Sequence, residues 1–251
     1  FSSTDEFINA FDTIDFSDET ILIKGARSFE FERIVSLLEE KTHETVLEIN
    51  LNALSHNFNY YKSKLKPSTK MMAMVKAFGY GSGSFEIAKL LAHHKVDYLG
   101  VAFADEGIEL KKAGIEVPIM VMNPEMTTFR SLIQHQLEPE IYSIRQLKAF
   151  LKIAEEKEVL NFPIHIKINT GMNRLGFDEE VVPELIEIIK KTKLVEIKTI
   201  LSHLAESDNA EDRTFTLEQI ALFDRLSTKI SNELDIKPIR HICNSSGITN
   251  Y

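Results

Sequence analysis

A lysine at the end of an apolar segment is the first candidate for chemistry. Lys76 follows MMAMV and precedes the glycine-rich segment AFGYGSG, which contains Tyr80. At the carboxyl end of a buried parallel strand, an ammonium group loses part of its hydration, which lowers its pKa and frees the amine to form a Schiff base with a carbonyl compound. A surface lysine after a strand is the alternative, and the glycines narrow the choice without settling it.

A second basic pair lies in HIKINTGMNRLGF, residues 165–177. Lys167 alternates with apolar residues inside an expected strand, where an ammonium must be paired or chemically altered to escape a heavy desolvation cost. Arg174 extends from a loop bounded by glycines and offers a permanently charged, planar donor suited to a phenolate or carboxylate oxygen. An ordinary salt-bridged pair is the alternative interpretation.

Two further polar sites follow later segments of strand character. His203 lies near the end of IKTILSHL, and Asn244, Ser245 and Ser246 follow RHIC and open the next expected helix. Hydroxyls and free backbone N–H groups at a helix start bind anions, and barrels often hold phosphate near their last loops. Taken singly, the histidine suits a satisfied core position and the asparagine a helix N-cap. Their placement at successive strand ends favours one common site.

From Leu47 onward, strand-like segments alternate with helical segments, and these elements must position the residues named above. This alternation is typical of βα units around a parallel sheet. Strands are expected at 71–77, 98–102, 118–122, 139–143, 163–169, 197–204 and 240–245. Amphipathic helices are expected at 53–64, 84–94, 104–114, 143–158 and 179–192. This order predicts an α/β fold, a (β/α)8 barrel that is incomplete because its last strand would lie beyond Tyr251. The alternating segment 44–51 suits a half-exposed strand of a separate sheet.

The first 43 residues differ from the rest. ETILIKGARSFEFERIVSLLEEK predicts a strand, a glycine turn and an amphipathic helix with Ile34, Val35, Leu37 and Leu38 on its inner side. That is too little chain to bury a core alone. We therefore predict a domain boundary near residues 40–45, which gives domains at 1–43 and 44–251.

Composition narrows the class of protein. The chain has 251 residues, 43% of them hydrophobic and 27% charged, and its formal net charge of -9 would repel a nucleic-acid backbone. No apolar segment approaches the roughly 20 residues of a membrane span, and the acidic first residues do not resemble a signal peptide. We expect a cytoplasmic protein without nucleic-acid or membrane partners. The single cysteine, Cys243, excludes an internal disulfide and a cysteine-rich metal site.

Taken in order, VKAFGYGSG, HIKINTGMNRLG, SHLAESD and CNSSG resemble the alanine racemase family, whose corresponding segments are similar to VKANAYGHG, VKxDTGMxRLG, THFAxAD and ANSAA. The likeness runs from about residue 45 to 251. It implies the family's barrel with bound pyridoxal 5'-phosphate, and interconversion of L- and D-alanine for peptidoglycan precursor synthesis. Ser82 and Phe78 depart from the family's usual residues, and neither change removes a catalytic group.

The resemblance implies roles for four of the residues at the expected strand ends. Lys76 would hold the cofactor as a Schiff base and act as the base on one face of the alanine Cα. Tyr80 would contact the cofactor phosphate. Lys167 would be the lysine that many relatives carbamylate, which would make it an anion able to pair with Arg174. Arg174 would donate to the phenolic oxygen of the cofactor.

The later motifs complete the implied site. His203 would lie against the pyridine ring, and Asn244 and Ser245 would belong to the wall that anchors the cofactor, with Ser245 at the phosphate. The family's arginine at the pyridine nitrogen and its opposite-face tyrosine belong to sequence that this chain lacks. Because racemisation needs acid–base groups on both faces of Cα, we expect the chain alone to lack full activity. The full-length protein is expected to be a homodimer.

Residues 1–43 resemble the carboxyl-terminal end of the ligase that joins D-alanyl-D-alanine to the UDP-N-acetylmuramoyl tripeptide. The likeness rests on ILIKGARSFEFERIV, similar to that family's VLVKGSRSxxxExVV. Some bacteria fuse this ligase to an alanine racemase, and the resemblance implies such a fusion here. The ATP site of the ligase would lie upstream, so no ligase activity is expected.

Other functions stay open at this point. The same barrel superfamily includes decarboxylases of basic amino acids and broad-specificity racemases, against which TGMNRLG favours an alanine racemase. A non-catalytic module similar to the small pyridoxal-phosphate homeostasis proteins would bind the cofactor without turnover. A chain that only tethers ligase and racemase halves would bind no cofactor.

Overall fold

The computed structural model describes residues 1–17, 19–38, 48–81, 83–209 and 211–251, and the chain divides into two compact units, Phe1–Glu48 and Ile49–Tyr251. The boundary predicted near residues 40–45 lies outside the described residues. No described helix combines the length and the apolar character that a bilayer crossing requires.

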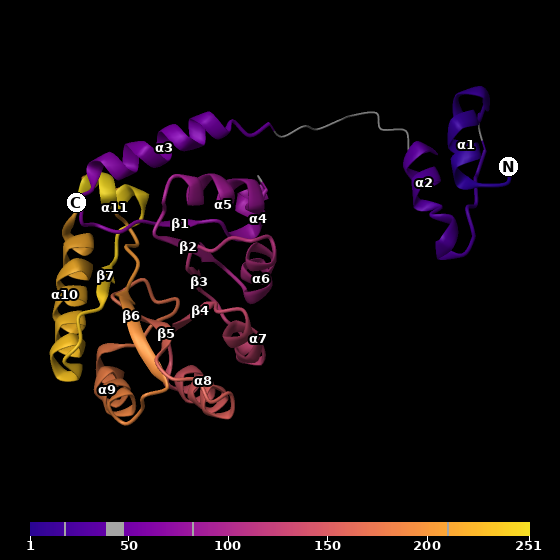
Figure 1. Cartoon of the computed structure of the whole chain (residues 1–251). Helices are drawn as coiled ribbons and strands as arrows, with labels where there is room; N and C mark the ends of the chain where they lie inside the picture. The colour runs from indigo at the N-terminus through magenta and orange to yellow at the C-terminus, as the bar shows by residue number, and fades with distance from the viewer. Residues whose placement is uncertain (18, 39–47, 82, 210) are drawn as a thin grey trace. The chain divides into compact units, whose positions relative to one another are not determined.

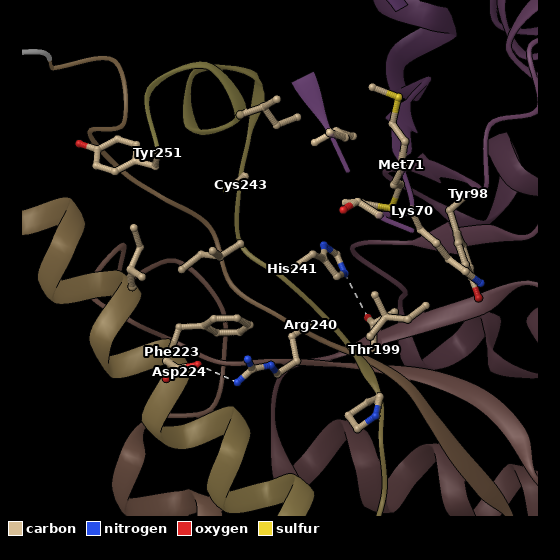
Figure 2. A pocket seen from close by; sticks show the side chains of 18 of the residues that line it. Lys70, Met71, Tyr98, Thr199, Phe223, Asp224, Arg240, His241, Cys243 and Tyr251 are labelled. Carbon is tan, nitrogen blue, oxygen red and sulfur yellow. Dashed lines mark hydrogen bonds and ion pairs between the residues drawn. The ribbon is translucent and has the colours of Figure 1, made fainter. Parts of the chain in front are cut away.

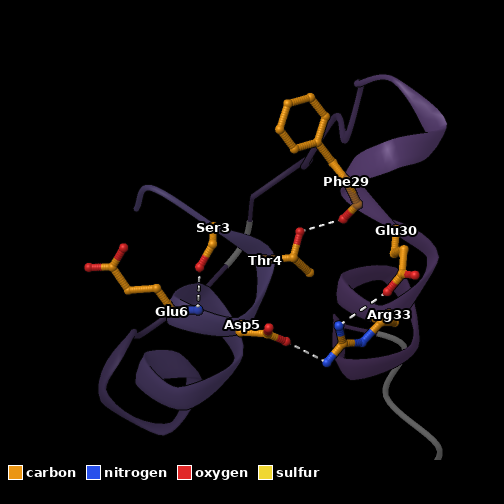
Figure 3. Close-up of polar contacts among 7 residues, drawn as sticks. All are labelled: Ser3, Thr4, Asp5, Glu6, Phe29, Glu30 and Arg33. Carbon is orange, nitrogen blue, oxygen red and sulfur yellow. Dashed lines mark hydrogen bonds and ion pairs between the residues drawn. The ribbon is translucent and has the colours of Figure 1, made fainter.

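The first unit consists of two short helices, α1 (Thr4–Ala10) and α2 (Glu32–Leu38), with 3-10 turns η1 (Phe11–Thr13) and η2 (Arg27–Phe29) between them. Ser3 caps α1, because its hydroxyl accepts a hydrogen bond from the Glu6 N–H. Two contacts join the halves of this unit, as Figure 3 shows: the Thr4 hydroxyl donates to the Phe29 carbonyl, and Arg33 pairs with Asp5 at 2.8 Å. Aromatic pairs such as Phe7–Phe11 and Phe29–Phe31 also contribute, so polar and aromatic contacts together hold the unit.

Two expectations for the amino-terminal part are wrong. Residues 19–25 form no strand, because among the described residues of this unit no second segment pairs with their backbone groups. Ile34 is buried as predicted, but Val35 and Leu37 are 40% and 39% exposed. The strand predicted at 44–51 also fails where it can be followed: residues 44–47 lie outside the described residues, and residues 48–50 are irregular before a helix begins.

The second unit contains seven parallel strands in sequential order. They are β1 (Met72–Met74), β2 (Tyr98–Val101), β3 (Ile119–Val121), β4 (Glu138–Ile141), β5 (Phe162–Lys167), β6 (Val195–Leu201) and β7 (Ile239–His241). Each of the seven overlaps a predicted strand, with ends that differ by up to four residues. Within the described residues β1 and β7 do not pair with each other, so the seven strands form the predicted barrel in incomplete form.

Helix α3 precedes β1, each strand is followed by at least one helix, and the helices surround the strands (Figure 1). They are α3 (Leu51–Lys64), α4 (Lys76–Gly81), α5 (Ser84–His93), α6 (Ala104–Lys112), α7 (Phe129–Gln134), α8 (Ile144–Glu156), α9 (Val182–Lys190), α10 (Thr214–Leu234) and α11 (Ser245–Asn250), with 3-10 turns η3 (Met126–Thr128) and η4 (Glu179–Val181). The apolar core lies between helices and strands, where Phe129 and Phe150 meet edge to face at 5.1 Å. Burial of this apolar layer is what fixes the strand ends in space.

Alternation along β5 decides which residues face the barrel interior. Successive side chains of a strand point to opposite faces. Ile164 and Ile166 are fully buried members of the apolar core, whereas His165 and Lys167 share the other face and contact polar partners from β4. On β5 the polar side chains therefore point to the barrel interior, and the apolar side chains pack against the helices outside.

Candidate functional site

Lys76 begins α4 immediately after β1, where the chain leaves the sheet. The Val75 N–H still pairs with the Gly100 carbonyl at 2.8 Å, so the backbone before Lys76 is held by the neighbouring strand. The Lys76 Nζ lies 5.9 Å from the centre of the Tyr80 ring, and this ring is 63% exposed. Lys76 and Tyr80 thus lie together at the carboxyl end of the barrel, as predicted.

Glu106 anchors the backbone beside Lys76. Its carboxylate accepts hydrogen bonds from the Ala77 N–H at 2.5 Å, the Ala102 N–H at 2.7 Å and the Phe103 N–H at 3.1 Å. The last two donors belong to the loop after β2, so one carboxylate at the start of α6 joins two neighbouring strand ends. Sequence reasoning missed this residue, since an acidic residue in the first turn of a helix needs no explanation beyond the helix dipole.

Lys167 ends β5 and is paired with an acid that sequence reasoning also missed. Its Nζ donates to Glu140 Oε1 at 2.8 Å, and the two side chains are 13% and 0% exposed. Glu140 Oε2 has no hydrogen-bond partner in the described part of the chain. Burial raises the pKa of Glu140 to about 7, although the charges of Lys167 and Arg174 favour its ionised form.

Arg174 is carried by a tightly folded loop. Asn169 Oδ1 accepts from the Gly171 N–H at 3.2 Å and from the Asn173 N–H at 3.1 Å, which closes the loop on its own strand. Gly176 has a φ of 138°, and a Cβ there would lie 2.5 Å from the backbone nitrogen of Asn169. Only glycine fits this approach. The loop is therefore fixed at both ends and presents the exposed Arg174 near Glu140.

His203 follows β6 and lies half-buried among the basic residues. Burial lowers the pKa of its imidazole. The positive charges of Arg174, Lys167 and Lys76 lower that pKa further, so the imidazole is mostly uncharged at neutral pH. Lys76 follows β1, Lys167 ends β5 and His203 follows β6, so the three lie on the carboxyl-end side of the sheet.

Asn244 and Ser245 lie at the start of α11. Asn244 is its N-cap: its Oδ1 accepts from the Gly247 N–H at 2.9 Å and from the Ser207 hydroxyl at 2.7 Å. This is the helix-cap alternative, and it also ties α11 to the loop that follows His203. Ser245 is exposed at the first helical position.

A second polar layer lies deeper in the barrel. His165, which is 1% exposed, contacts Glu138 Oε2 through Nε2 and Thr199 Oγ1 through Nδ1, both at 2.9 Å. His241 Nε2 contacts the same hydroxyl at 3.1 Å. Burial raises the pKa of Tyr98 to about 12, and burial lowers the pKa of His241 to about 4. Sequence reasoning assigned this layer no role, because its members come from five different strands.

A cavity of about 780 Å³ opens between β1 and β7. Figure 2 shows Met71 and Tyr98 on one side, Phe223 on the other and His241 between them, with a hydrogen bond between His241 and Thr199. Lys76, Lys167 and Arg174 do not line it. No group of described histidine, cysteine, aspartate or glutamate side chains is arranged to hold a metal ion.

The fold and the site together define a parallel α/β barrel whose strand ends gather two lysines, an arginine and a histidine. Residues 49–251 match the family model described as "Alanine racemase, N-terminal domain". The chain belongs to this family.

Curated relatives of this chain are also alanine racemases. Alanine racemase of Thermodesulfovibrio yellowstonii is 40% identical over 207 residues, which cover 81% of this chain and 54% of that protein. Alanine racemase 1 of Oceanobacillus iheyensis is 34% identical over 203 residues, covering 80% and 53%. The chain thus spans about half the length of the curated relatives it matches. The family match begins at residue 49, so the ligase resemblance of residues 1–43 stays a prediction.

Solved structures show the same fold. The alanine racemase of Clostridium difficile 630 superposes with a TM-score of 0.75 at 33% identity, covering 82% of this chain and 55% of that one. A Bartonella henselae alanine racemase, solved with covalently bound pyridoxal phosphate, gives a TM-score of 0.72 at 28% identity and covers 81% and 57%.

Proposed function

We propose that this chain is the barrel half of an enzyme that interconverts L- and D-alanine with pyridoxal 5'-phosphate. The observation that carries the proposal is the placement of Lys76, Lys167 and His203 at the carboxyl ends of β1, β5 and β6 in a member of this family. Support comes from relatives named alanine racemase and from the Bartonella henselae protein, which was solved with that cofactor bound.

The residues present fit such a cofactor. Pyridoxal phosphate carries a phosphate and a phenolate, and the site offers three cations in a partly buried setting. Glu140 supplies a buried acceptor oxygen that no described residue satisfies. When bound, the cofactor would supply an aldehyde for an amine and a ring that spreads the negative charge left at the substrate Cα.

Each residue has a distinct task in this proposal. The Lys76 amine holds the cofactor and moves a proton at one face of the alanine Cα. Arg174 donates to the phenolic oxygen, where its permanent charge keeps that oxygen ionised. His203 packs against the ring as an uncharged surface, since its lowered pKa avoids adding a fourth cation.

Phosphate anchoring is assigned to a second group of residues. Tyr80 contacts the phosphate, and Ser245 donates to it from the first turn of α11. Asn244 holds that turn against the loop after His203 through its bond to the Ser207 hydroxyl. These roles rest on the family resemblance and on the placement of the residues at neighbouring strand ends.

The finer features of the resemblance are also proposals. Racemisation needs a group on each face of Cα, and in the family the second group lies outside the matched half, so this chain alone would lack full activity. The whole protein would be a cytoplasmic homodimer joined to a muramoyl-tripeptide ligase, and it would supply D-alanine for peptidoglycan precursors. Carbamylation of Lys167 is a separate matter, because Glu140 already provides an anion there.

Borohydride trapping tests the cofactor site. The chain is incubated with pyridoxal phosphate, reduced with borohydride and digested, and the modified peptide is sequenced by mass spectrometry. We expect the label on Lys76 and its loss in Lys76→Ala. Lys89→Ala on α5 is the matched control, since its Nζ lies over the Phe85 ring in the same way, at 5.8 Å. A label on another side chain, or none, would refute the assignment.

Turnover separates the remaining classes of function. D-alanine formed from L-alanine is measured for this chain and for a longer version that includes the other half of the family's sequence. Activity of the longer version with alanine, and not decarboxylation of basic amino acids, is the expected result. Cofactor binding without turnover in the longer version would instead indicate a non-catalytic module.

A further inference from the structure

We propose that Glu140 is the resident anion of this site, and that Lys167 stays an ammonium ion paired with it instead of carrying a carbamate. The inference deepens the proposed function and rests on it for the identity of the cofactor. It assigns to Glu140 the task that the family resemblance gives to a modified lysine, the neutralisation and positioning of Arg174.

Two acid–base pairs, each called a rung below, connect β4 with β5 inside the barrel. Glu138 contacts His165 at 2.9 Å, and two residues further along the same strands Glu140 contacts Lys167 at 2.8 Å. In both rungs β4 supplies the carboxylate and β5 supplies the base. This arrangement suits a cationic Lys167, because the partner that it meets is already an acid.

A carbamate on Lys167 would place two anions side by side. Glu140 is completely buried, so no water screens it from a new negative charge on Lys167. Carbon dioxide reacts with an uncharged amine, whereas a carboxylate at 2.8 Å favours the ammonium form. Burial already raises the pKa of Glu140 to about 7, so loss of the neighbouring cation would make the carboxyl group take up a proton. Modification therefore requires two unfavourable changes at once.

Arg174 has an acceptor ready without any modification. Glu140 Oε1 is used by Lys167, and Oε2 is buried without a partner in the described residues. The charge of Arg174 already acts on Glu140. We expect the guanidinium to donate to Oε2 when the cofactor is bound, which aligns it toward the phenolic oxygen. Glu140 is thus a positioning residue that acts through Arg174.

The test uses carbon-13 NMR of the whole chain in labelled bicarbonate above neutral pH, where a lysine carbamate gives its own carbonyl resonance. We expect no such resonance in the wild type. Glu140→Gln removes the anion with little change of shape, and we expect a carbamate there that Glu140→Gln/Lys167→Ala loses. Glu138→Gln is the matched control one rung below, and it should stay unlabelled. A wild-type resonance that Lys167→Ala abolishes would overturn the proposal.

Cofactor affinity provides a second measurement. Wild-type affinity for pyridoxal phosphate should not change with bicarbonate, whereas Glu140→Gln should bind about tenfold more weakly in its absence, the loss expected for one charge-assisted hydrogen bond. Tighter wild-type binding on addition of bicarbonate contradicts the idea. So does an unlabelled Glu140→Gln that binds like the wild type. If no form binds the cofactor, the proposed function fails, while the wild-type spectrum still decides the state of Lys167.

Discussion

Replacing Glu140 should change how the stability of the protein depends on pH. Burial raises the pKa of Glu140 from 4.5 to about 7 in the folded chain. The folded state therefore binds a proton more tightly than the unfolded state, and this contribution to stability is complete below pH 4.5 and lost as the pH rises through about 7. The difference of about 2.5 pKa units, 7 minus 4.5, corresponds to about 3 kcal/mol at 1.36 kcal/mol per unit.

Urea unfolding at a series of pH values measures this contribution. The unfolding free energy of the wild type, taken relative to Glu140→Gln, should fall by about 3 kcal/mol across that window. Glu138→Gln is the control, because it removes a carboxylate from the same strand without touching Lys167. Parallel curves for wild type and Glu140→Gln between pH 4.5 and 7 would mean that this carboxyl group is not the one that titrates.

Three further changes have expected outcomes. Gly176→Ala forces a Cβ to 2.5 Å from a backbone nitrogen and should destabilise the chain by about 2 kcal/mol, whereas Gly114→Ala, where nothing lies within 4 Å, should cost about 1 kcal/mol; thermal unfolding compares the two. Phe150→Ala empties a fully buried site between α8 and the sheet and should cost about 4 kcal/mol in urea unfolding, so a cost below 1 kcal/mol would contradict the described core. Glu106→Ala frees the backbone beside Lys76 and removes three hydrogen bonds, so titration should show about tenfold weaker binding of pyridoxal phosphate and the unfolding temperature should fall as well.

The strand order of the barrel was predictable because each unit carries a local signal. Apolar segments such as 98–102 and 118–122 are short and bounded by amphipathic helices, so their positions do not depend on distant residues. The amino-terminal segment ILIKG has the same local signal and forms no strand. A strand exists only where a partner satisfies its backbone, and the sequence of one segment does not contain its partner.

The site was predictable to the extent that its residues follow strands. Lys76, Lys167 and His203 were found from their positions in or after apolar segments, and the structure places them at the ends of β1, β5 and β6. The role of Glu140 was not predicted, because it depends on how β4 and β5 are aligned along each other. Its ladder partner is His165, and it reaches Lys167 on the diagonal. This alignment is set by the packing of whole strands, as is the irregularity between Ile164 and His165 in the pairing with β6.

The opening between β1 and β7 gives the deep polar layer its own contact with solvent. His241, Thr199 and His165 line the cavity in sequence, each joined to the next through the Thr199 hydroxyl. A hydroxyl both donates and accepts, so Thr199 can hydrogen-bond both imidazoles at once. The buried Glu138–His165 pair is therefore connected to a histidine that lines this cavity, whereas Glu140 and Lys167 do not line it.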